Sequence, residues 1–67
     1  MLKIETEREE DGRWIAEVLA IPGVVAYGAT EPDARARVTA LALRVIADRL
    51  ERGEPLLREL SGIFEAA

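Results

Sequence analysis

The sequence predicts an α+β fold in which a three-stranded antiparallel sheet packs against one long helix. Two segments near the start of the chain alternate apolar and polar residues, as half-buried strands do. A third segment, rich in valine, follows a Pro-Gly turn. A long run without an internal helix breaker then begins at Thr30 and stops at Gly53. Strands followed by one helix at this chain length favour a single two-layer domain.

The first two strands are expected at residues 2–9 and 13–19, joined as a hairpin. A two-residue turn would place Trp14 on the same face as Glu9, which makes a poor core, because a slip of one residue turns every side chain over. A three-residue loop at residues 10–12, with Gly12 in the left-handed conformation, avoids this conflict. The register it predicts pairs Arg8 with Trp14, Thr6 with Ala16, and Ile4 with Val18.

This register places acidic side chains on the outer face of the sheet, away from the helix. The expected members are Glu5, Glu7, Glu9 and Glu17, with Ile15 as the one exposed apolar residue among them. Such a face can steer a basic protein partner. It can equally be a solvated face that keeps the sheet from pairing with other chains. Alternate carboxylates can also bind a metal, but nothing in the pattern makes them converge.

The third strand is expected at residues 24–29, after a turn at Pro22 and Gly23. Gly28 marks a bulge or a close approach of the backbone just before the helix. Trp14 and Tyr27 suit the margin of a core, with their polar edges toward water. As an alternative, they are anchors of a protein interface.

The helix is expected over residues 31–52. Thr30 is a suitable N-cap, Pro32 fits the first turn, and Gly53 fits the position after the last turn. At 100° per residue, Val38 lies on the face that meets the sheet, together with Ala34, Leu41, Ala42 and Val45. A second apolar face carries Leu43, Ile46 and Leu50. Because one sheet does not need so wide an apolar arc, we expect a homo-oligomer, a dimer or a tetramer, formed through this second face.

Residues 54–67 form a tail that begins at a Glu-Pro break. Leu56, Leu57, Leu60, Ile63 and Phe64 match a short amphipathic helix, whereas Ser61 and Gly62 interrupt it and favour a short strand. The pattern favours a turn of helix followed by an extended segment.

Composition narrows the function. The 67 residues contain no cysteine and no histidine, so the commonest nucleophile, general base and metal ligands are missing, and we expect neither an enzyme nor a cofactor. A net charge of −4 and a pI near 4.7 argue against direct nucleic-acid binding. No secretion signal or membrane span is visible, so we expect a cytoplasmic protein. A chain this short buries only about 60% of its unfolded surface, which also favours oligomerisation.

Several motifs together resemble the HicB family of antitoxins. They are the acidic hairpin with Asp11 and Gly12, the aromatic residue shortly after it, the Ile21-Pro22-Gly23 turn, and the Tyr27-Gly28-Ala29-Thr30 segment that opens the helix. The resemblance covers about residues 2–54. It departs from the family pattern where Leu19-Ala20-Ile21-Pro22-Gly23 lacks a first proline and where Pro32 replaces a common acid.

The resemblance implies a sheet and helix similar to part of the ribonuclease H fold, and a role in neutralising a small, basic, RNA-cleaving HicA-type toxin. Longer family members carry a C-terminal DNA-binding domain, and the chain ends at Ala67 without one, so operator binding is not expected. Nuclease activity is not expected either, because fold does not carry function. The alternative function is an orphan homo-oligomeric module, structural or ligand-binding, with no toxin partner.

Overall fold

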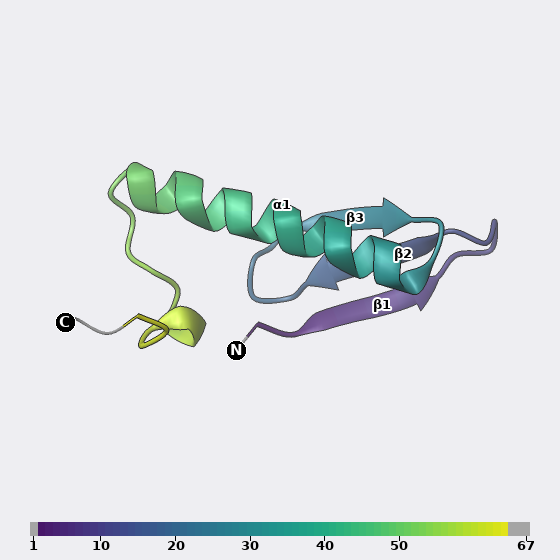
Figure 1. The fold of residues 1–67 in the computed structure, drawn as a ribbon, viewed down its shortest axis with the longest axis horizontal. Helices are drawn as coiled ribbons and strands as arrows, with labels where there is room; N and C mark the ends of the chain where they lie inside the picture. The colour runs from purple at the N-terminus through teal and green to yellow at the C-terminus, as the bar shows by residue number, and fades with distance from the viewer. Residues whose placement is uncertain (1, 65–67) are drawn as a thin grey trace.

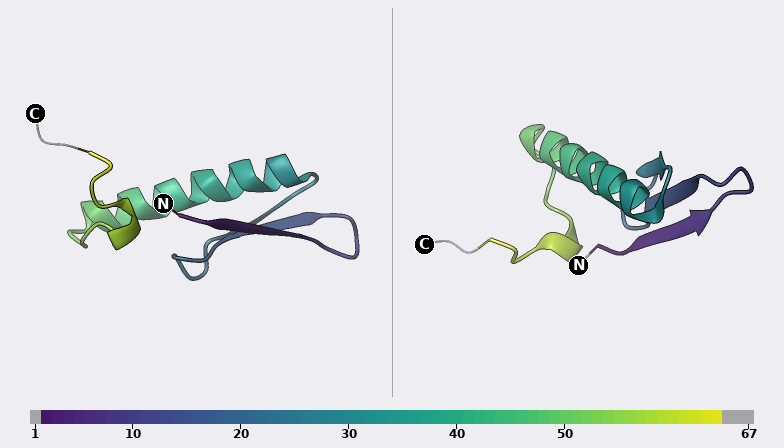
Figure 2. Two further views of the ribbon diagram at one scale, coloured as in Figure 1. Left: turned by 90° about the horizontal axis from the view of Figure 1, so that it is seen from below. Right: turned by 45° about the vertical axis from the view of Figure 1, so that its right-hand side comes forward.

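The computed structural model describes residues 2–64 and confirms the α+β architecture. Strands β1 (Ile4–Arg8), β2 (Trp14–Val18) and β3 (Val25–Gly28) form an antiparallel sheet in the order β1-β2-β3. Helix α1 (Glu31–Glu51) lies across one face of this sheet, and a short 3-10 helix, η1 (Arg58–Leu60), follows it (Figure 1). Seen from the side, sheet and helix form two layers (Figure 2).

The hairpin between β1 and β2 has the register predicted from the sequence. Arg8 pairs with Trp14, Thr6 with Ala16, and Ile4 with Val18. The loop closes through two backbone hydrogen bonds, from Glu9 N to Arg13 O at 2.7 Å and from Gly12 N to Glu9 O at 3.0 Å. Gly12 has φ +91°, the left-handed conformation that the three-residue loop requires.

The connection from β2 to β3 contributes to the core as well as to the turn. Ile21 is fully buried, and backbone hydrogen bonds link it to Val18 and Val24 at 3.1 Å each. β3 then runs to Gly28, where the chain passes close to the start of α1. A Cβ atom at Gly28 would lie 2.5 Å from the backbone nitrogen of Ala34, so the expected close approach is confirmed.

Both ends of α1 are capped as the sequence predicts. The Thr30 hydroxyl accepts a hydrogen bond from Asp33 N at 3.2 Å, and Asp33 in turn accepts one from Ala29 N at 3.3 Å. At the other end, Gly53 has φ +86° and donates to Leu50 O at 3.0 Å. Glu54 N donates to Arg49 O at 2.9 Å, which completes a Schellman motif.

The core lies between the sheet and the first half of α1. Its buried members are Ala16, Val18, Ile21, Val24, Ala34, Val38 and Ala42. Most of these side chains are small because the helix lies close to the sheet. Trp14 is half-buried and packs against this cluster, as expected for an aromatic residue at the margin of a core.

α1 is longer than the sheet it covers. Its 21 residues extend about 31 Å, whereas the five residues of β2 extend about 17 Å. The second half of the helix therefore reaches past the strands, and the tail folds back beneath it toward the start of β1 (Figure 1). None of the helices in residues 2–64 is long and apolar enough to cross a membrane.

The tail contains one short helical turn, η1, in place of a strand. Leu57, just before η1, packs against the core cluster. Residues 61–64 form a turn and a bend, so the extended segment expected here is not found within residues 2–64. The rest of that expected segment, residues 65–67, lies outside the part of the chain that the structure describes.

Candidate functional site

One face of the sheet packs on α1, and no helix or strand of residues 2–64 covers the other face (Figure 2). We call this uncovered side the outer sheet face. The strand register defines its members in two rows across the sheet. One row is Glu7, Ile15 and Tyr27, and the other is Glu5, Glu17 and Val25.

The outer sheet face is divided between acid and apolar side chains. Glu5 and Glu7 lie on the edge strand β1, and Glu17 lies beside Glu5 on the central strand. Val25 and Tyr27 lie on the opposite edge strand, β3, and Tyr27 is 43% exposed. Ile15 is half-buried at the centre, between Glu7 and Tyr27. The face thus offers an apolar patch bordered on one side by carboxylates.

Glu9 lies just beyond the end of β1 and is half-buried, and its backbone N–H donates to Arg13 O at 2.7 Å, so the pairing of the hairpin, and the alternation with Glu5 and Glu7, continue to it. One sequence expectation for this face needs correction. Ile15 is not the only apolar residue on the face, because Val25 and Tyr27 share it. Tyr27 therefore lies outside the core margin where the sequence favoured placing it. The hairpin was assigned to its faces from β1 and β2 alone, which left β3 out.

The carboxylates of the outer sheet face have no internal counter-charge. Glu5 and Glu17 are direct cross-strand neighbours, and both are exposed. Within residues 2–64, neither these two nor Glu7 forms an ion pair or a side-chain hydrogen bond. Like charges directly opposite each other destabilise a sheet. The face consequently carries negative charge that a basic partner would neutralise.

On the apolar side of the face, Tyr27 is in contact with Arg13 of the hairpin loop, which in turn binds Asp11. The guanidinium carbon of Arg13 lies 4.7 Å from the centroid of the Tyr27 ring, a cation–π contact. Arg13 also donates from its backbone N–H and from Nε to the carboxylate of Asp11, at 3.0 and 2.7 Å. These bonds, the backbone one first, lower the pKa of Asp11. The tyrosine ring is thus held from one side in a defined orientation.

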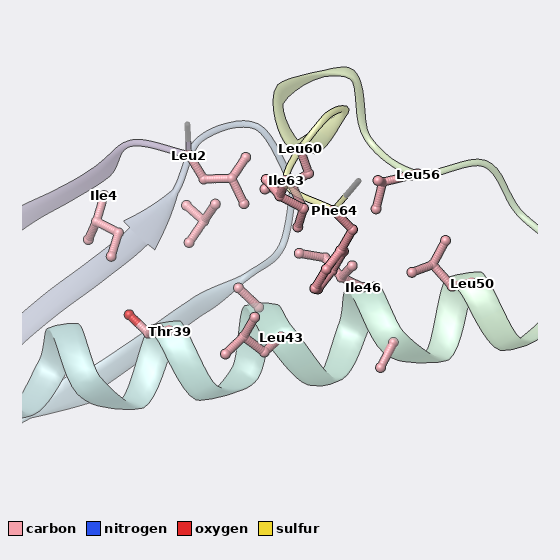
Figure 3. A pocket seen from close by; sticks show the side chains of 13 residues that line it. Leu2, Ile4, Thr39, Leu43, Ile46, Leu50, Leu56, Leu60, Ile63 and Phe64 are labelled. Atoms are coloured by element: carbon pink, nitrogen blue, oxygen red, sulfur yellow. The ribbon is translucent and has the colours of Figure 1, made fainter. Parts of the chain in front are cut away.

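A second surface is an apolar groove of about 330 Å³ between the second half of α1, the start of β1 and the tail (Figure 3). It is lined by Leu2, Ile4, Val18, Thr39, Ala42, Leu43, Ile46, Ala47, Leu50, Leu56, Leu60, Ile63 and Phe64. All but one of these residues are apolar. The groove exists because the helix extends past the sheet and the tail covers only part of the excess.

The residues expected to form an oligomer interface line this groove, with unequal exposure. Leu43 is 62% exposed and Leu50 is 44% exposed, as an interface surface requires. Ile46 is half-buried and packs against the core cluster, so it does not belong wholly to a second face. Ile46 follows the buried Ala42 by four residues and so lies only about 40° from it around the helix, at the border between the two faces.

Neither surface has the arrangement of a metal site. Among residues 2–64, no three acidic side chains lie close enough together to hold a metal ion. No side-chain polar atom in this part of the chain is buried without a hydrogen-bond partner. What the two surfaces offer is contact area for another macromolecule.

No family model, curated protein or solved structure matches the sequence. The class of protein is therefore defined by the fold and its surfaces. It is a small α+β protein with one uncovered sheet face, partly acidic and partly apolar, and one apolar groove.

Proposed function

We propose that this protein is an antitoxin-like binding protein, which neutralises a small, basic, RNA-cleaving toxin of the HicA type by masking it. The observation that carries this proposal is the outer sheet face. Its three exposed carboxylates, Glu5, Glu7 and Glu17, form no ion pair within residues 2–64 and border an apolar patch. An apolar centre with a charged border is the usual composition of a protein interface.

The apolar patch supplies the contact that charge alone does not. Tyr27 is a large, partly exposed aromatic residue of the type that dominates binding energy at interfaces. Arg13 fixes its ring, so little rotamer entropy is lost when a partner covers it. Ile15 beside it would become fully buried in the same contact.

We expect the toxin to be masked because a ribonuclease needs positive charge on the surface that binds RNA. A protein that binds RNA presents lysine and arginine side chains to phosphates. Carboxylates at Glu5, Glu7 and Glu17 would compete for those cations and occupy the surface that the RNA requires. The motif resemblance to HicB proteins, above all in the segment from Tyr27 to Thr30, supports the same partner.

Co-expression with the product of the neighbouring gene, which the proposal expects to be a small basic protein, tests the proposal. We expect the two chains to co-purify and this chain to restore the growth that the basic protein arrests. Glu7→Lys and Glu17→Lys should each weaken the complex about 10-fold, which corresponds to about 1.4 kcal/mol. Binding should also weaken as salt concentration rises.

Glu54→Lys is the matched control, because it makes the same charge change at an exposed position beyond the helix, away from the outer sheet face. It should bind nearly as tightly as the unchanged chain. Loss of binding in this variant as well would show that only overall charge matters. Absence of any complex, together with failure to restore growth, would refute the proposal.

A second candidate is a homo-oligomeric module, structural or ligand-binding, without a toxin partner. The apolar groove and the exposed Leu43 and Leu50 favour it, because a small protein rarely leaves such residues uncovered. This alternative predicts a stable oligomer and no complex with the product of the neighbouring gene. The two functions are thus separated by the co-expression experiment.

A further inference from the structure

Five exposed apolar residues lie along the side of α1 that faces away from the sheet. These residues, which we call the outward helix face, are Ala36, Ala40, Leu43, Ala47 and Leu50. Their spacing alternates between four and three residues, the repeat of a coiled-coil seam. At 100° per residue they lie opposite the buried side of the helix, which carries Val38.

Leu43, Ala47 and Leu50 line the apolar groove, but the buried core of residues 2–64 does not account for this repeat. The core uses the other side of the helix, and Leu43 remains 62% exposed. A lone surface helix normally carries polar residues opposite its buried face. Here the five positions extend about 21 Å along the helix, which is long enough to pair with a second helix.

In an antiparallel pair, large and small side chains of the outward helix face match those of a second copy. If Leu43 faces Leu43 of a second copy on a two-fold axis, Ala36 lies opposite the second copy's Leu50, and Ala40 lies opposite its Ala47. Each large leucine away from the axis then meets a small alanine. Such alternation of large and small side chains allows two helices to pack closely.

Two of the three charges beside the outward helix face are complementary in the same antiparallel register. Arg37, Arg44 and Glu51 each follow a seam position directly, on one side of it. In an antiparallel pair, Arg37 meets Glu51 of the second copy, and this contact occurs twice. Arg44, beside the two-fold axis, meets the second copy's Arg44, a single contact between exposed like charges. A parallel pair would instead place these charges beside Thr39 and Ile46, which offer no opposite charge.

Both partners of this charge pair are accessible. Arg37 is exposed and binds Asp33 at 3.2 Å through Nε, so its two terminal nitrogens point to no acceptor within residues 2–64. Glu51 is exposed and forms no ion pair in the same part of the chain. A second copy would supply Glu51 with an opposite charge and Arg37 with a second carboxylate besides that of Asp33.

The apolar groove borders the outward helix face. Leu43, Ala47 and Leu50 belong to both, and Figure 3 shows Leu43 and Leu50 on the α1 side of the groove. A helix laid along the outward helix face would therefore cover this side of the groove too. In the antiparallel register, Thr39 and Ile46 of the two copies would meet along the same border.

We propose that a second copy of this chain docks antiparallel along α1, with Leu43 on the two-fold axis and Arg37 paired with Glu51 of the other copy. The dimer joins the two molecules by their helix layers. Each outer sheet face then lies on the far side of its own subunit, so two partners can bind at once. The dimer does not depend on the proposed toxin partner.

Molar mass by light scattering is the first test. The 67-residue chain of 7.4 kDa should elute with twice that mass at micromolar concentration. Leu43→Glu should yield a folded monomer with the same helical circular dichroism. Leu19→Glu is the matched control, because Leu19 is 48% exposed after β2, away from α1, and this variant should remain a dimer. A monomeric parent chain, or a dimeric Leu43→Glu variant, would overturn the proposal.

Disulfide trapping tests the register, and the absence of native cysteine makes it unambiguous. Leu43→Cys should cross-link to itself on mild oxidation. Ala36→Cys alone should not, whereas a mixture of Ala36→Cys and Leu50→Cys chains should cross-link to each other. Efficient cross-linking of Ala36→Cys to itself would show a parallel pair and overturn the proposed register.

Charge reversal tests the flanking pair. Arg37→Glu and Glu51→Arg should each raise the dimer dissociation constant several-fold, because each places like charges together. The double variant should restore dimerisation toward that of the unchanged chain. Additive weakening in the double variant would contradict the Arg37–Glu51 contact, even if the chain remained a dimer.

Discussion

Gly28 and Ala34 are in such close approach that a Cβ atom on Gly28 would lie 2.5 Å from the backbone nitrogen of Ala34 and 2.9 Å from its Cα. This contact joins the end of β3 to the first turn of α1. Backbone atoms cannot move aside as the end of a flexible side chain can. Only glycine, whose side chain is a single hydrogen atom, therefore fits at position 28. This residue determines how closely α1 lies on the sheet.

Gly28→Ala should lower the free energy of unfolding by about 2 kcal/mol or more, because the helix must shift to make room. Urea denaturation followed by Trp14 fluorescence measures this change. Gly23→Ala provides the comparison, since it meets no atom within 4 Å but has φ +88°. Gly23→Ala should lower the free energy of unfolding only by the backbone strain, about 1 kcal/mol. Equal losses in the two variants would contradict the close approach as the cause.

Thr6 joins the sheet to the helix by a side-chain hydrogen bond. Its Oγ1 donates to Glu31 Oε2 at 2.6 Å, and both residues are half-buried. Thr6→Val keeps the shape and removes the donor, so it should cost about 1 kcal/mol. Glu31→Ala, which removes the acceptor, combined with Thr6→Val in a double-mutant cycle should give a coupling energy of similar size. Strictly additive effects would show that the bond contributes nothing in solution.

The features predicted correctly from the sequence were those that depend on local chemistry. Gly12 permits only a loop with one left-handed residue, and the alternation around Trp14 then leaves a single register with a sound core. The ends of α1 were predictable for the same reason, because Thr30 and Gly53 each supply a cap that few other residues supply.

The features missed were those that depend on how elements meet. β3 has apolar residues at both even and odd positions, so its pattern does not show that Tyr27 faces outward. The approach of Gly28 to Ala34 decides that orientation. Ile46 lies at the border of the buried side, about 40° from Ala42, and it lines the groove with residues of the tail. The periodicity of α1 gives its position on the helix but not the return of the tail.

Asp11 should titrate below its usual pKa of 3.8, because Arg13 donates to its carboxylate first from the backbone N–H and then from the side chain. A carboxyl whose pKa is lowered on folding stabilises the protein above the unfolded pKa. That contribution is lost as pH falls from 3.8 through the folded pKa. NMR titration of the Asp11 carboxyl carbon measures the shift.

Arg13→Ala separates the two causes of this shift. It removes the side-chain bond and the positive charge but keeps the backbone N–H, so the pKa of Asp11 should rise only partway toward 3.8. The same variant removes the cation–π contact with Tyr27 and should shift the resonances of the tyrosine ring. A full return to 3.8 would show that the backbone bond has no effect.

Glu5 and Glu17 face each other across β1 and β2 and form no ion pair within residues 2–64, an arrangement that costs stability in the isolated protein. Glu5→Lys should therefore raise the free energy of unfolding by about 0.5 kcal/mol at low salt, and the gain should shrink as salt screens the pair. The same substitution should weaken binding to the proposed basic partner, because it removes a carboxylate from the outer sheet face. Urea denaturation and a binding titration on one preparation measure both effects. A variant that is neither more stable nor weaker in binding would show that these carboxylates serve only as a solvated surface.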